Sequence, residues 1–274
     1  MLSPFISWLC GSLEILLPRE CLVCGRPLRG ASLCFRCTPP PPPFSSLAAA
    51  RCPRCFVPHS PRDSSEPCET CRLYPPLFLR SRCLWEYSGL TRDLIRAMKY
   101  RPSMYLARRC GETLAESLPK LFPGATWDVI VPVPGSGTHF RKRLFHPCSL
   151  IARVVGRAHG IPVIECLARS SRRAPQASLS HEQRLTGLRN FFRARSSSAV
   201  AGCRVLLVED VITTGATSAA AVRALLKTGA ATVDVLAVAR TSVWTRFRRR
   251  VYESLGGLDT GEVGSRPAHG YKLP

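Results

Sequence analysis

The stretch Arg204-Val-Leu-Leu-Val-Glu-Asp-Val-Ile-Thr-Thr-Gly-Ala-Thr-Ser218 decides the fold of this chain. It opens with a near-continuous apolar run of strand length, which is typical of a strand buried on both faces of a parallel sheet. Two carboxylates, Glu209 and Asp210, stand at the expected carboxyl end of that strand. After a short polar loop, a helical pattern follows from Ala219 to Lys227. This order of strand, loop and helix predicts an α/β fold.

The loop between strand and helix has the composition of a phosphate cradle. Its residues are Thr213, Thr214, Gly215, Ala216 and Thr217, three of which carry a hydroxyl. Backbone N–H groups and the positive end of a helix dipole point into such a loop. Two carboxylates beside the cradle distinguish it from a nucleotide P-loop, because they suit the vicinal hydroxyls of a sugar, directly or through a divalent metal. The alternative interpretation is an ordinary strand–loop–helix unit with polar caps.

Aliphatics, two acids and a Thr/Ser-Gly loop in this order resemble the phosphoribosyl pyrophosphate (PRPP) signature of type I phosphoribosyltransferases. By this resemblance, Glu209 and Asp210 hold the ribose hydroxyls, and residues 213–217 bind the 5′-phosphate. The resemblance also implies PRPP as a ligand and Mg²⁺ as the cofactor bound with it.

Charge and length limit the possible classes of protein. The chain has 274 residues, enough for one ordinary domain and a small second one. It carries 39 basic and 18 acidic residues, a formal net charge of +21. Such an excess predicts attraction to polyanions, with nucleic acid first and an anionic membrane surface second.

Eight of the fourteen cysteines form four C-x-x-C pairs, and these predict two zinc sites. The expected ligands are Cys21, Cys24, Cys34, Cys37, Cys52, Cys55, Cys68 and Cys71. Each pair can present two thiolates, and two pairs complete one tetrahedral site. Sequential pairing is the simplest arrangement, and a crossed arrangement stays open. Free dithiols or redox pairs are the alternative.

The start of the chain is apolar but lacks a basic leader, carries Glu14 and is short for a membrane span. It predicts an amphipathic helix, no stable membrane insertion, and a cytoplasmic, reduced protein in which paired cysteines hold metal. The expected organisation is an N-terminal helix at 1–18, a double zinc ribbon at 19–73, a phosphoribosyltransferase-like domain at 80–241 and a basic, disordered tail at 242–274. A five-proline run at 39–43 suits a stiff spacer.

Further strand and helix patterns complete the α/β domain. Strands are expected at 84–87, 127–132, 162–167 and 232–239, and helices at 90–100, at 107–118 and from Phe140 onward. The parallel sheet would therefore be flanked by helices.

Basic residues surround a second strand-to-helix loop, which holds prolines and glycines at 132–137. A long basic segment at 168–190 has no apolar period and suits a lid, with a solvated surface loop as the alternative. The expected pyrophosphate and lid residues are Lys99, Arg101, Arg141, Arg143, Arg169, Gln176 and Arg184.

Taken in order, the motifs resemble the ComF/GntX family, which joins a double zinc ribbon to a phosphoribosyltransferase domain and is linked to natural DNA uptake. They are the four C-x-x-C pairs, the Leu94–Arg101 run, Val131-Pro-Val-Pro134, the Pro175–Ser180 run and the PRPP stretch.

The chain departs from that family at three places. It has Glu209 before Asp210 where the family usually has two aspartates. It has Arg-Leu-Phe-His-Pro at 143–147 where the family commonly has Arg-Gly-Phe-Asn-Gln, and Gly-Leu-Arg-Asn at 187–190 replaces Asn-Val-x-Gly.

The resemblance implies a PRPP-binding protein that acts in DNA uptake with single-stranded DNA and competence proteins as partners. Two other functions stay open: an orthodox phosphoribosyltransferase of nucleotide metabolism, and a PRPP sensor without turnover. Neutralising Asp210 should abolish PRPP binding but not DNA binding, because it removes a PRPP contact and leaves the basic surface intact. This difference separates the PRPP-dependent functions from DNA binding.

Overall fold

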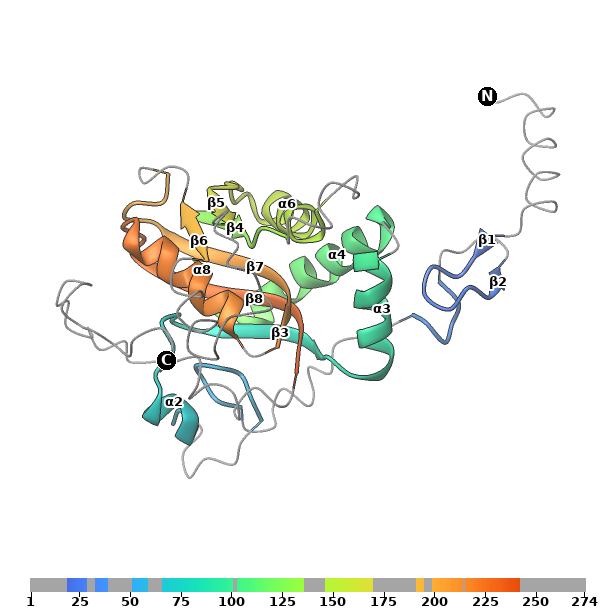
Figure 1. Ribbon diagram of the computed structural model, residues 1–274, viewed down its shortest axis with the longest axis horizontal. Helices are drawn as coiled ribbons and strands as arrows, with labels where there is room; N and C mark the ends of the chain where they lie inside the picture. The colour runs from blue at the N-terminus through green and yellow to red at the C-terminus, as the bar shows by residue number, and fades with distance from the viewer. Residues whose placement is uncertain are drawn as a thin grey trace, which may run out of the picture.

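A four-stranded parallel sheet forms the centre of the protein in the computed structural model (Figure 1). Its strands, in spatial order, are β3 (Ser81–Glu86), β8 (Thr232–Arg240), β7 (Arg204–Ile212) and β4 (Val129–Pro132). The apolar runs of β7 and β8 are buried almost throughout, as expected for central strands covered on both faces. The predicted α/β fold with a parallel sheet is confirmed.

The structure describes most of the α/β part and both cysteine-rich parts of the chain. The described residues are 19–28, 33–38, 51–58, 66–100, 103–135, 146–169, 191–194, 199–213 and 215–241. The predicted N-terminal helix, the proline run, the helix start at Phe140 and the C-terminal tail lie outside these residues.

Helices cover both faces of the sheet. They are α3 (Gly89–Tyr100), α4 (Met104–Leu121), α6 (Pro147–His159) and α8 (Ala216–Lys227). Helices α4 and α6 pack together on one face, where a Cβ added at Gly111 would lie 2.9 Å from Cβ of Val154. Helix α8 follows β7 and packs on the other face (Figure 1). This is the arrangement that right-handed crossovers between parallel strands produce.

The region after α6 differs from the sequence prediction. The strand expected at 162–167 is reduced to one parallel bridge between Val163 and Ile130, at the outer edge of β4. Two short strands then pair antiparallel: β5 (Leu167–Arg169) and β6 (Phe192–Ala194). The two ends of the long basic segment are therefore joined at its base.

Helix α6 begins at Pro147, with His146 as its N-cap. The residue before a proline disfavours the helical conformation, so the helix cannot extend smoothly back through His146.

The two cysteine-rich parts occupy different places. The first includes the two-stranded pair β1 (Arg19–Glu20) and β2 (Pro27–Leu28), which lies beside α3 and apart from the sheet (Figure 1). The second ends in α2 (Glu69–Leu73) and shares one hydrophobic core with the sheet. Within the described part of the chain, no helix has the length and apolar character needed to cross a membrane.

Candidate functional site

The site lies at the carboxyl edge of the sheet, where β7 ends and α8 begins. Four other elements reach the same edge: the last turn of α3, the loop after β4, the start of α6 and the end of β5. Because all four sheet strands are parallel, their carboxyl ends meet at one edge. Residues that are distant in sequence therefore surround the two acids of β7.

Asp210 forms an ion pair with a lysine from another element. Its Oδ1 atom lies 2.9 Å from Nζ of Lys99, in the last turn of α3, and the two side chains are 18% and 31% exposed. Burial alone would lower the pKa of Lys99, but the charge and hydrogen bond of Asp210 outweigh it, and the pKa is raised. Lys99 is therefore positively charged where it contacts this carboxylate.

Glu209 stands in different surroundings, although it is the adjacent residue. Its carboxylate is buried and accepts a hydrogen bond from the hydroxyl of Ser218 in α8. Burial raises the pKa of Glu209 to about 8, against the opposing effects of Ser218, Lys99 and Arg169. Successive side chains of a strand point to opposite faces, so the two acids do not act as an equivalent pair.

The phosphate-type loop is anchored at both ends. Gly215 has a φ of 75°, in the left-handed region, and is the N-cap of α8. Thr241, just after β8, donates from its hydroxyl to the carbonyl of Thr213 at 3.0 Å and from its N–H to Ile212 at 3.0 Å. The first turn of α8 therefore points its backbone N–H groups toward this loop.

The loop after β4 is held by a histidine and an arginine. The backbone N–H of Ser149 donates to Nδ1 of His146 at 3.3 Å, which caps α6, and the same ring faces Gly135, where any Cβ would collide with it. Arg169 donates from Nε to the carbonyl of Pro134 at 3.3 Å. The base of the long basic segment is thus tied to the second loop of the site.

Two buried thiols line the site without being reactive. Cys148, in the first turn of α6, is buried, and burial together with the charges of Asp210 and Glu209 raises its pKa. Burial also raises the pKa of Cys110 in α4 to about 12. Both groups are neutral thiols near pH 7, so neither supplies a nucleophile.

The structure brings together part of the predicted site. The described predicted residues gathered at this edge are Lys99, Arg169, Glu209, Asp210, Thr213, Gly215, Ala216 and Thr217. The predicted residues outside the described ranges are Arg101, Arg141, Arg143, Gln176, Arg184 and Thr214.

Sequence reasoning missed the roles of three residues here. Ser218 holds Glu209, Cys148 borders Asp210, and His146 caps α6 and lies against Gly135. Only Ser218 carried a signal in the sequence, because it ends the hydroxyl-rich run.

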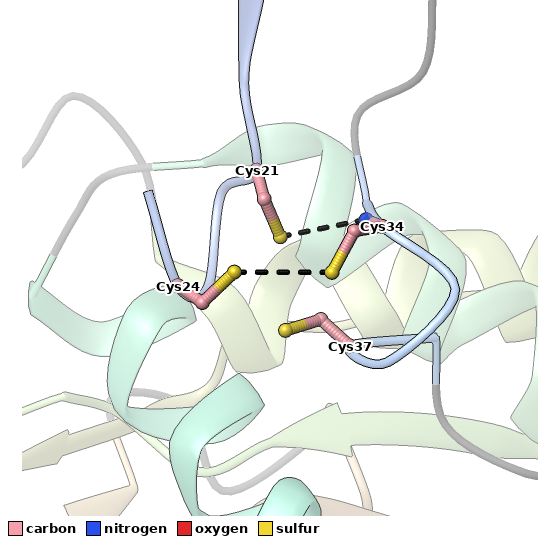
Figure 2. Close-up of side chains that lie close together, drawn as sticks. All are labelled: Cys21, Cys24, Cys34 and Cys37. Atoms are coloured by element: carbon pink, nitrogen blue, oxygen red, sulfur yellow. Dashed lines mark hydrogen bonds between the residues drawn. The ribbon is translucent and has the colours of Figure 1, made fainter. Parts of the chain in front are cut away.

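The eight paired cysteines form two separate groups of four. The first group is Cys21, Cys24, Cys34 and Cys37, whose sulfur atoms point toward one another (Figure 2). The second is Cys52, Cys55, Cys68 and Cys71. Within each group the sulfur atoms all lie within 4.8 Å of one another. The pairs are thus grouped sequentially, and each group fits one tetrahedral metal ion.

Comparison with known proteins identifies the family of this chain. The model of the phosphoribosyl transferase domain matches residues 103–250. DNA utilization protein YhgH of Escherichia coli O6:H1 is 31% identical over 196 residues, which cover 69% of this chain and 84% of that protein. YhgH of Shigella flexneri is 29% identical over 82% of this chain and 98% of its own length. Competence protein ComFC of Bacillus subtilis is 27% identical over 66% of this chain and 73% of its own length. The chain therefore belongs to the phosphoribosyltransferase family, with relatives named for DNA utilization and competence.

Proposed function

We propose that this protein binds PRPP with Mg²⁺ at the carboxyl edge of its sheet and handles single-stranded DNA during DNA uptake. One observation carries the PRPP part: Asp210 is partly exposed near the carboxyl end of β7, a few residues before Gly215 caps α8. A carboxylate beside a helix N-terminus suits a sugar phosphate, because the acid can bind hydroxyls while the N–H groups bind phosphate.

Each element of the edge has its own task in this proposal. Asp210 binds a ribose hydroxyl, and Glu209 supports it from the buried side, where Ser218 holds the carboxylate. The loop at 213–217, including Thr214, binds the 5′-phosphate. Pyrophosphate lies toward the loop after β4, facing Lys99 and Arg169. The sequence predicts further contacts from Arg101, Arg141, Arg143, Gln176 and Arg184.

The donor set fits Mg²⁺. Asp210 offers a partly exposed carboxylate, and Mg²⁺ is usually held by one or two carboxylates together with phosphate oxygens and water. When bound, the ion would neutralise charge on the pyrophosphate. The protein's residues would position the ribose and stabilise the negative charge of the departing pyrophosphate. This task requires no nucleophilic side chain.

We also propose that the two cysteine groups hold two zinc ions as closed structural sites. Thiol groups converge in both, and hydrogen bonds from Cys55, Cys68 and Cys71 lower the pKa of Cys52 far below its ordinary value. A thiolate is the form that binds zinc. Metal-bound cysteines suit a reduced cytoplasm. Elemental analysis should return two zinc ions per chain, and clearly less than one would refute the proposal.

The DNA part rests on the formal charge of +21 and on relatives named for DNA utilization and competence. Competence proteins are the expected partners. A preference for single-stranded over double-stranded DNA that persists at several hundred millimolar salt would separate base stacking from simple charge attraction.

Substituting Asp210→Asn tests the PRPP site. It should weaken Mg²⁺-dependent PRPP binding at least about tenfold in calorimetry, because it removes the charge that holds hydroxyl and cation. Asp93→Asn is the matched control, since Asp93 is half-exposed on α3 and pairs with Arg92. Unchanged PRPP affinity in Asp210→Asn would rule out the assigned contact. Single-stranded DNA binding should be equal in both variants.

A further inference from the structure

The carboxylate that the proposed function assigns to PRPP already has a cation from the protein itself. Nζ of Lys99 lies 2.9 Å from Oδ1 of Asp210. The lysine comes from α3, whereas the aspartate lies two residues before the end of β7, so the pair joins two elements that are far apart in sequence. Both side chains are mostly buried, at 31% and 18% exposure, so water screens this pair less than a surface pair.

Among the residues that the structure describes, the groups around the pair do not offer Asp210 another cation at the same distance. Glu209 is a buried carboxylic acid that already accepts a hydrogen bond from Ser218, and Cys148 is a neutral thiol. Arg169 lies near Glu209 and donates to the carbonyl of Pro134. Among the described residues, Lys99 is the cation in direct contact with Asp210.

A divalent ion and the lysine ammonium would compete for one carboxylate. Two cations at about 3 Å from the same oxygen repel each other strongly in a partly buried site. A metal ion therefore binds Asp210 more tightly once the ammonium has moved away. The pyrophosphate of PRPP would offer the displaced ammonium a new anion, so substrate and metal together make the displacement favourable.

We infer that Lys99 is a resident counter-ion that holds the place of Mg²⁺ at Asp210 until Mg²⁺ and PRPP displace it. The inference rests on the proposed function and deepens it, because it names the residue that sets the metal requirement of the site. It also predicts that the site binds a metal ion weakly when PRPP is absent. A lysine that only contacted pyrophosphate would neither set the metal requirement nor weaken metal binding in the absence of PRPP.

The counter-ion role and the pyrophosphate-contact role predict different binding changes when Lys99 is replaced. In Lys99→Met, the Mg²⁺ concentration at half-maximal PRPP binding should fall by about tenfold, because an opposite charge within a few ångströms changes the cation affinity of a carboxylate by one or more orders of magnitude. A simple pyrophosphate contact predicts weaker PRPP binding at saturating Mg²⁺ and an unchanged metal midpoint.

The experiment titrates Mg²⁺ at fixed PRPP by calorimetry, and Mn²⁺ without PRPP by electron paramagnetic resonance. Lys99→Arg should keep the high metal requirement of the natural protein, because it keeps the charge. Arg96→Met is the matched control, since it removes one positive charge from an exposed position of the same helix. Thermal melting shows that each variant is folded.

The outcomes separate the inference from the proposed function. An unchanged Mn²⁺ affinity and Mg²⁺ midpoint in folded Lys99→Met, or an equal change in Arg96→Met, would overturn the counter-ion inference. Absence of PRPP binding in all variants at saturating Mg²⁺ would overturn the proposed PRPP site. In that case, an about tenfold tighter Mn²⁺ affinity in Lys99→Met alone would still support the counter-ion.

Discussion

The two cysteine groups share one backbone plan and differ in what surrounds it. In the first, Gly25 donates to the carbonyl of Cys21 at 2.9 Å; in the second, Phe56 donates to the carbonyl of Cys52 at 2.9 Å. The following pairs also correspond, because the N–H groups of Cys37 and Cys71 donate to the carbonyls three residues earlier. The chain therefore contains the same four-cysteine unit twice.

The residue after the second cysteine shows how the two copies differ. Both copies require a left-handed backbone there: φ is 74° at Gly25 and 64° at Phe56. Glycine adopts this conformation without strain, whereas a bulky residue is strained by about 1–2 kcal/mol. Phe56 tolerates the strain because its ring is buried against the guanidinium groups of Arg51 and Arg82, each 5.0 Å from the ring centroid.

Arg82 connects the second group to the sheet. From β3, it donates to the carbonyls of Pro53 at 2.9 Å and Leu121 at 3.0 Å, and burial lowers its pKa to about 10. The first group instead packs at Leu90 of α3 and leaves Cys24 exposed. One copy is therefore part of the α/β core, and the other is an attached module.

The largest expected difference in stability between the two copies follows from replacing one cysteine in each. Cys55→Ser should lower the free energy of unfolding by about 5 kcal/mol or more, because metal binding supplies folding energy to a site inside the core. Cys24→Ser should change the stability of the α/β core by less than about 1 kcal/mol. Denaturant unfolding and zinc analysis of both variants measure this.

Each variant should retain about one zinc ion per chain, so that metal content does not account for the difference. Equal destabilisation by both substitutions would show that the two groups are equally integrated, against the packing described above.

A smaller effect is expected for the arginine that joins the second copy to the sheet. Arg82→Met should cost about 3 kcal/mol, because it leaves buried carbonyls unpaired and removes the stack on Phe56 and Phe122. The matched control is Arg36→Met in the first copy, where an exposed arginine lies 5.5 Å from the ring of Phe35. Its effect on stability should stay below about 0.5 kcal/mol.

Both variants are compared by chemical denaturation at one salt concentration. If Arg82→Met unfolds like the control, the polar links between β3 and the second cysteine group do not stabilise the core.

Replacing the strained phenylalanine sets two effects of opposite sign against each other. Phe56→Gly relieves about 1–2 kcal/mol of backbone strain and loses about 3–5 kcal/mol of buried ring packing. We therefore expect a net loss of about 2 kcal/mol, measured by denaturation. Gly25→Ala tests the first copy, where the nearest atom to an added Cβ is 3.9 Å away and only the backbone resists. It should leave the melting of the α/β core unchanged.

A gain of stability in Phe56→Gly would mean that strain outweighs packing at this position. The attachment of the second copy to the sheet would then depend on Arg82 and not on the ring of Phe56.

Sequence alone predicted the parts of this architecture that depend on local pattern. The apolar runs predicted β7 and β8, and the C-x-x-C spacing predicted two groups of four, because both patterns are short-range. The ion pair between Lys99 and Asp210 was not predicted, since it joins residues that only the folded sheet brings together. The different burial of Glu209 and Asp210 was missed for a related reason, because it depends on which side of β7 Ser218 approaches.

The integration of the second cysteine group also could not be read from the sequence. Phe56 and Arg82 are ordinary residues in the chain, and their contact arises from the docking of residues 51–58 against β3. The strand expected at 162–167 was largely wrong, because Val163 forms a single bridge and Glu165 pairs with Arg153 of α6 at the surface.

The smallest expected effect concerns DNA and separates the surfaces of the two copies. Between the last two cysteines of the first group stand Phe35 and Arg36; the corresponding residues of the second are Glu69 and Thr70. Phe35 is 79% exposed. An exposed ring beside a guanidinium suits a stacked base near a phosphate, whereas an acid in the same place repels a polyanion.

Phe35→Ala should weaken single-stranded DNA binding by about 1 kcal/mol without changing the salt slope or the melting temperature, because it removes stacking and no charge. Leu73→Ala is the matched control, since it removes a 62% exposed apolar side chain next to the second group. Filter binding across a salt series compares both with the natural protein. Equal DNA affinity in Phe35→Ala and Leu73→Ala at every salt concentration would show that the aromatic tip of the first copy does not contact DNA.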